Sequence, residues 1–171
     1  MKRILQLLFL GLVLLVLFMG YKTLQFKSQQ IKVDAVTLNP VGEQVVDRFA
    51  KAVTLPTISP EKESDFDSLA FFQFNDFLKT SFPLADSLLE KKRFNHFSHL
   101  YKWTGSDPSL KPVILMAHLD VVPVIAENLT DWKQPPFEGK IVNDTLWGRG
   151  TIDNKIGVIG LLEATEALLS N

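Results

Sequence analysis

The sequence predicts an α/β domain with three layers, preceded by one transmembrane helix. Three observations lead to this fold class: an uncharged apolar stretch over residues 4–21, a change from helical to alternating periodicity after Lys92, and an uninterrupted apolar run over residues 112–117. The chain has 171 residues, of which 46% are hydrophobic and 22% charged, so it is long enough for one sizeable core. The formal net charge of −1 argues against nucleic acid as a partner, and the absence of cysteine excludes disulfides and thiolate metal sites.

Residues 1–22 are interpreted as a signal anchor that spans a membrane. Lys2 and Arg3 precede the apolar stretch, whose length approaches the roughly 20 residues that span a bilayer. No Ala-x-Ala cleavage site follows, which favours an uncleaved anchor over a cleaved signal. A buried core helix is the other alternative, and it is discounted because no polar face interrupts the apolar run. The anchor places the following domain on the extracytoplasmic side of a membrane, and secretion is the alternative. Residues 23–38 are polar and are expected to form a linker, and the domain is expected to cover residues 39–171.

The helices follow from apolar residues at helical spacing. Asn39 is typical of an N-cap, with Pro40 at the first helical position. Helices are expected over residues 41–53, 65–82, 86–90 and 154–169. The phenylalanines of the second helix are interpreted as a packed core face rather than as a cofactor site.

The strands follow from alternation and from turn residues. Phe97, Tyr101 and Trp103 occupy alternate positions, which predicts a strand within residues 92–103. The apolar run over residues 112–117 predicts a strand that is covered on both faces. Residues 137–142 and 145–147, joined by Asn143 and Asp144, predict a hairpin.

His118 and Asp120 follow the covered strand directly. The carboxyl ends of strands are where ligands gather in α/β proteins, so this position favours a metal ligand. Asp120 can accept a hydrogen bond from the ring nitrogen of His118 that does not face the metal, which fixes the tautomer of the ring. The alternatives are that His118 is a hydrogen-bonded core residue and that Asp120 caps a turn before Pro123.

Asp153 follows a second predicted strand, after a sharp turn at Gly148, Arg149 and Gly150. A carboxylate can bridge two metal ions, although Asp is also an ordinary helix cap. Arg149 is available to neutralise a neighbouring carboxylate, and Lys155 is expected at the surface. The two glycines also resemble the opening of a dinucleotide-binding loop, but Asp153 would aim a negative charge at the pyrophosphate, which argues against a nucleotide.

Three joined motifs carry a resemblance to a known family. They are VILMAHLDVVP at residues 113–123, WKQPPFEG at residues 132–139 and WGRGTIDNKIG at residues 147–157. Together they resemble the dinuclear zinc peptidases of the carboxypeptidase S and aminoacylase family, which includes the secreted N-acyl-amino-acid hydrolase and synthase. The resemblance runs from about residue 41 to residue 171.

The resemblance implies the partial catalytic domain of a three-layer zinc peptidase and a role for each site residue. His118 would bind one zinc ion, Asp153 would bridge two, and Asp120 would be the catalytic-site aspartate that orients His118. Two Zn²⁺ ions are expected in a complete site, with Co²⁺ or Mn²⁺ as alternatives. The family's general-base Glu and its dimerisation domain match nothing in this chain, so a homodimer is expected only of a longer form.

The expected function is therefore that of a membrane-anchored metallohydrolase, acting on C-terminal peptide bonds or N-acyl-amino-acid amide bonds. Zinc sites usually have at least three protein ligands, and this chain supplies two, His118 and Asp153. The chain is accordingly expected to be a truncated form that is inactive by itself. The alternative is a non-catalytic membrane-anchored domain that keeps the fold as a binding module.

Overall fold

The computed structural model describes residues 1–35 and 41–171 and divides the chain into two units, residues 1–39 and 40–171. Over residues 1–35 the first unit holds one helix, α1 (Lys2–Leu24), which continues past the predicted end at residue 22. By length and composition α1 can cross a membrane, a test that a signal sequence near the N-terminus passes equally. Residues 26–35 form neither helix nor strand. The predicted cap at Asn39 and Pro40 lies outside the described residues.

The described residues of the second unit contain four α-helices. They are α2 (Glu43–Val53), α3 (Ser68–Ser81), α4 (Pro83–Leu88) and α5 (Lys155–Leu169). Apolar spacing predicted three of them, the first of which begins at Glu43 rather than at residue 41, and a short fourth helix was expected over residues 86–90. Helix α3 begins later than predicted because the Asp67 carboxylate accepts the backbone N–H groups of Leu69 and Ala70, which caps the helix at that point. Helix α4 begins at Pro83 rather than at residue 86, since proline is favoured in the first turn.

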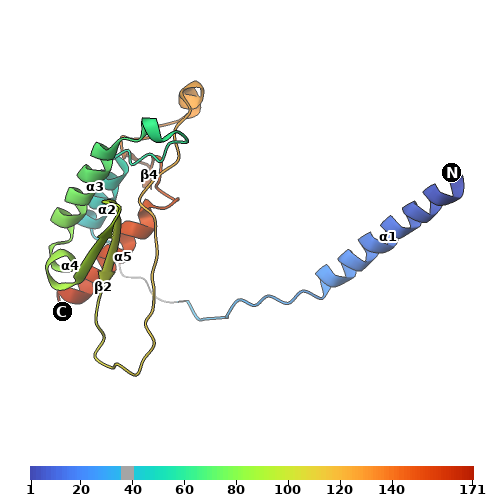
Figure 1. The fold of residues 1–171 in the computed structure, drawn as a ribbon, viewed down its shortest axis with the longest axis horizontal. Helices are drawn as coiled ribbons and strands as arrows, with labels where there is room; N and C mark the ends of the chain where they lie inside the picture. Colours follow the sequence, from blue (N-terminus) through green and yellow to red (C-terminus); the bar gives the residue numbers. More distant parts are fainter. Residues whose placement is uncertain (36–40) are drawn as a thin grey trace. The chain divides into compact units, whose positions relative to one another are not determined.

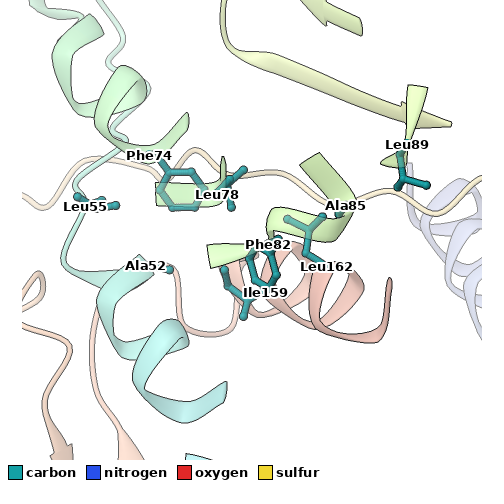
Figure 2. Close-up of a cluster of buried hydrophobic side chains, with 9 residues drawn as sticks. All are labelled: Ala52, Leu55, Phe74, Leu78, Phe82, Ala85, Leu89, Ile159 and Leu162. Carbon is teal, nitrogen blue, oxygen red and sulfur yellow. The ribbon is translucent and has the colours of Figure 1, made fainter. Parts of the chain in front are cut away.

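The hydrophobic core lies where these four helices meet (Figure 1). The phenylalanine face of α3 belongs to it, as predicted: Phe74 is fully buried and Leu78 nearly so. Figure 2 shows these side chains with those that the other elements contribute. The core consists of Ala52, Leu55, Phe74, Leu78, Phe82, Ala85, Leu89, Ile159 and Leu162.

The strands of the described residues form two small antiparallel sheets. One pairs β1 (Glu90–Phe94) with β2 (Ser98–Lys102), and the other pairs β3 (Ile141–Val142) with β4 (Thr145–Leu146). The second sheet is the predicted hairpin in shorter form, with its turn residues Asn143 and Asp144 both at positive φ. The prediction for residues 92–103 is wrong in part, because Asn95 and His96 adopt positive φ there and reverse the chain.

The prediction of a covered strand over residues 112–117 is also wrong. The segment forms neither helix nor strand, and its side chains are exposed, with Met116 at 85%. A strand exists only through hydrogen bonds to a neighbouring strand, and residues 1–35 and 41–171 offer this segment none. One isolated parallel bridge, between Ile58 and Val121, is the nearest approach to a parallel sheet in this part of the chain. Helices and strands are mixed as in an α/β domain, and the three-layer arrangement remains a prediction.

Candidate metal centre

The segment that carries His118 and Asp120 is held by the residues that follow α2. The N–H of Val121 donates to the carbonyl of Thr57 at 2.8 Å, and the N–H of Ser59 donates to the carbonyl of Val121 at 2.9 Å. The hydroxyl of the fully buried Thr57 donates to the carbonyl of Leu119 at 2.6 Å. These bonds fix the backbone on both sides of Asp120.

The side chains of His118 and Asp120 lie against each other. Nδ1 of His118 is 3.1 Å from the carbonyl oxygen of Asp120 and 3.3 Å from its carboxylate oxygen Oδ1. The other carboxylate oxygen, Oδ2, accepts the hydroxyl of Ser59 at 2.7 Å. Asp120 is therefore in place to orient the imidazole, while Ser59 orients Asp120.

Asp153 reaches the opposite side of the same imidazole. Its Oδ1 lies 2.8 Å from Nε2 of His118, although 35 positions separate the two residues in the sequence. Asp153 lies in the turn before α5, whose N-cap is Asn154, and the peptide bond between these two residues is cis. The structure thus brings together His118, Asp120 and Asp153, the three site residues that the sequence predicted.

The chemistry of this cluster requires a cation at the imidazole. Both ring nitrogens of His118 face oxygen acceptors, but a neutral imidazole has only one N–H to donate. The second side is satisfied by a second proton or by a metal ion. The hydrogen bond to Asp153 raises the pKa of His118, which favours the second proton.

The donor set fits zinc or a similar divalent ion. An imidazole nitrogen and a carboxylate oxygen are ligands that zinc accepts, and Asp120 supplies the outer hydrogen bond that a metal-binding histidine usually makes. Two donors at about 2.0 Å from a tetrahedral ion lie about 3.3 Å apart, so His118 and Asp153 need to separate only slightly from 2.8 Å. Among the residues described, no group of three or more potential ligands surrounds a single point. The cluster therefore supplies part of a metal site.

A cavity opens at this cluster. His118, Asp120 and Asp153 line it, together with Arg149 and Trp132. The guanidinium of Arg149 lies 5.3 Å from the centre of the Trp132 ring. Within the described parts of the chain Arg149 forms no ion pair, so the expected neutralisation of a nearby carboxylate is not observed.

The expectation that Lys155 lies at the surface is wrong. The residue is fully buried, and its ammonium donates hydrogen bonds to the carbonyl oxygens of Ala52, at 2.9 Å, and Leu55. Burial lowers the pKa of Lys155 to about 7. Its acceptors are about a hundred positions away in the sequence, so no local pattern indicates the contact.

Sequence reasoning also missed the roles of Thr57 and Ser59 beside the cluster. Their hydroxyls hold Leu119 and Asp120, but both contacts span more than 60 positions of the chain. The one available signal was that both residues lie within the range of the family resemblance, which begins at about residue 41.

Comparisons with known proteins agree with the motifs. Residues 114–171 match the model of Peptidase family M20/M25/M40. A probable carboxypeptidase S-like 2 of Dictyostelium discoideum is 36% identical and aligns with 99% of this chain and 33% of its own length. Carboxypeptidase S of Saccharomyces cerevisiae is 38% identical over 80% of this chain and 25% of its own length. An N-fatty-acyl-amino acid synthase/hydrolase of Danio rerio is 40% identical over 74% of this chain and 24% of its own length.

The chain thus spans about a quarter to a third of the length of these curated relatives. The similarity includes all three residues of the cluster, since His118, Asp120 and Asp153 lie within the matched range. The resemblance to the M20 peptidases is confirmed.

Proposed function

Residues 114–171 belong to the M20 family of peptidases, and from this premise we propose that the protein is a metal-dependent hydrolase of amide bonds. Its substrates are peptides cleaved at the carboxyl end or N-acyl amino acids, the two classes that the names of its relatives mention. The observation that carries the proposal is the 2.8 Å contact between His118 and Asp153. The alternative that His118 is a hydrogen-bonded core residue does not explain why a second carboxylate lies at its other ring nitrogen.

The proposed roles follow from the contacts of each side chain. His118 and Asp153 would hold the metal, and Asp153 would also be a ligand of a second ion. The backbone carbonyl of Asp120 accepts the Nδ1 proton of His118, and its carboxylate lies 3.3 Å from the same nitrogen. Asp120 thereby keeps the ring in the tautomer that frees Nε2, and Ser59 orients the Asp120 carboxylate. Divalent zinc is the expected ion, with cobalt and manganese as alternatives.

When bound, such an ion polarises the amide carbonyl and lowers the pKa of water, which supplies the electrophile and the nucleophile for hydrolysis. The protein contributes the fixed positions of its ligands. It also contributes the cavity beside Trp132 and Arg149, where an acyl or amino-acid group can lie next to the cluster. General-base catalysis is expected from a residue outside this set, and the chain alone is expected to be inactive because it supplies too few ligands.

We further propose that α1 anchors the protein in a membrane with residues 41–171 on the extracytoplasmic side. The support is the length and apolar composition of α1. Protease protection of sealed microsomes, with carbonate extraction, tests the anchor. Release of the protein into the soluble fraction after cleavage would instead identify α1 as a signal peptide.

The activity is tested with a form of the protein that is longer than residues 1–171, an N-acyl amino acid and added zinc. Asp120→Ala should reduce turnover by at least about 10–100-fold, the usual effect of removing the residue that orients a metal-binding histidine. The matched control is Asp76→Ala, which removes an exposed carboxylate of α3 and should leave turnover unchanged. Undiminished turnover in Asp120→Ala would refute the assignment. Absence of metal-dependent hydrolysis in the wild type would favour the non-catalytic binding module.

A further inference from the structure

The buried ammonium of Lys155 lies at the end of α2. Its two acceptors are the carbonyl oxygen of Ala52, in the last turn of that helix, and the carbonyl oxygen of Leu55, which follows the C-cap Thr54. The carbonyl end of a helix attracts positive charge. The ammonium also lies 5.0 Å from the centre of the Phe74 ring, within the range of a cation–π interaction. Lys155 is therefore fixed to the helical core at its far end.

The backbone of Lys155 holds the loop that carries Asp153. Its backbone N–H donates to the carbonyl of Gly150 at 2.9 Å, which closes the loop 150–155. Gly150 has a φ of +89°, and a Cβ there would lie 2.7 Å from Cγ1 of Val121 and 3.2 Å from Cδ of Lys155. The loop thus lies directly on the stem of Lys155, with Val121 beside it.

We propose that Lys155 is the positioning residue of the candidate metal centre, which ties the loop of Asp153 to the segment that also holds His118 and Asp120. This inference rests on the proposed function. The shared segment is residues 52–59: its first part accepts the ammonium of Lys155, and its last part pairs with Val121. One short stretch of chain thereby sets the distance between two ligands that lie far apart in the sequence.

The energetic reason is that the carbonyl groups of Ala52 and Leu55 stabilise the buried charge of Lys155. Without the ammonium, each carbonyl keeps one backbone donor, the N–H of Leu55 on Ala52 and the N–H of Thr57 on Leu55, and loses its charged donor. A relaxed α2 end and a loosened loop follow from that loss, and both movements carry Asp153 away from His118. Zinc affinity then falls, because the ligands are no longer preorganised.

The inference is tested with Lys155→Met in the full 171-residue chain in detergent micelles. Methionine keeps the length and apolar character of the stem and removes the charge and the donors. We expect faster amide hydrogen exchange over residues 150–155 and loss of the His118 ring N–H signal that reports the contact with Asp153. We also expect zinc binding, followed by the same ring signals, to weaken by about 10–100-fold. The matched control is Lys140→Met, which removes an exposed lysine of the β3–β4 hairpin region and should change none of these readouts.

Each outcome has one meaning. A folded Lys155→Met protein with unchanged ring signals and zinc affinity overturns the inference, even if its unfolding free energy is lower, because a purely structural lysine gives that result. If Lys155→Met does not fold, exchange in the wild type decides: protection of the Lys155 amide equal to that at the end of α2 supports the inference, and an unprotected amide overturns it. If the wild-type chain shows no zinc-dependent shift, the ring N–H signal and the exchange over residues 150–155 decide the inference, and the hydrolysis assay decides the proposed function separately.

Discussion

The ion pair between Arg48 and Glu163 joins α2 to α5 and yields the most quantitative prediction. Nε and Nη2 of Arg48 donate to the two carboxylate oxygens of Glu163 at 2.5 and 2.6 Å. The side chains are only 29% and 15% exposed, and the guanidinium also lies 5.7 Å from the centre of the Phe82 ring. The carboxylate of Glu163 raises the pKa of Arg48, so the guanidinium stays charged at any pH near neutrality.

The coupling free energy between Arg48 and Glu163 is expected to lie between two known limits. Exposed pairs contribute about 0.2–1 kcal/mol, and breaking a fully buried pair costs about 3–5 kcal/mol. A half-buried bidentate pair is therefore expected to show a coupling of about 2 kcal/mol. A double-mutant cycle measures this coupling from the unfolding free energies of the wild type, Arg48→Met, Glu163→Gln and the double variant. Each protein is unfolded with urea, and unfolding is followed by tryptophan fluorescence. The fluorescence reports only on residues 41–171, since all three tryptophans lie there.

The control cycle uses Glu90 and Lys102, a pair whose side chains are 53% and 60% exposed. Its coupling should be indistinguishable from zero at high salt, whereas that of Arg48 and Glu163 should persist because burial limits screening. A coupling below about 0.5 kcal/mol for Arg48 and Glu163 would refute the reasoning from burial and bidentate geometry.

Three further predictions concern the same folded unit. Phe74→Ala should lower the free energy of unfolding by about 3–5 kcal/mol, since the ring is fully buried; a loss below about 1 kcal/mol in urea unfolding would contradict the core. Asp67→Ala should cost about 1 kcal/mol by removing the cap of α3, with Asp67→Asn close to wild type, and equal losses in both variants would contradict capping. Burial, with a smaller effect of Arg93, lowers the pKa of His99 in the folded state below its ordinary 6.5. The unfolded state then binds more protons, so stability should fall as pH drops below about 6.5. His99→Gln should flatten that part of the pH profile, and an unchanged slope would exclude His99 as its source.

Much of the helical structure was predictable because it is encoded locally. Apolar spacing predicted α2, α3 and α5, and Asn143 with Asp144 predicted the turn of the β3–β4 hairpin. The β1–β2 hairpin was missed because Asn95 and His96 form its turn without a glycine. The apolar run at residues 112–117 was misassigned, because its composition indicates a strand and cannot supply the neighbouring strand that makes one.

The three clustered residues of the candidate site were predictable from the sequence, and the residues that hold them were not. His118, Asp120 and Asp153 occur in motifs with characteristic spacing, and the structure places them together. Ser59, Thr57 and Lys155 act through contacts that span more than 60 positions, and their residue types are ordinary at a surface or in a loop. Only the folded chain reveals that they hold the cluster.

The central claim is that the imidazole at position 118 and the carboxylate at position 153 share one divalent cation. X-ray absorption at the zinc edge, on protein loaded with substoichiometric zinc, tests it most directly. The account predicts an imidazole nitrogen and carboxylate oxygens at about 2.0–2.2 Å, and loss of this pattern in both His118→Ala and Asp153→Asn. Zinc that keeps the same coordination in either variant would contradict the account.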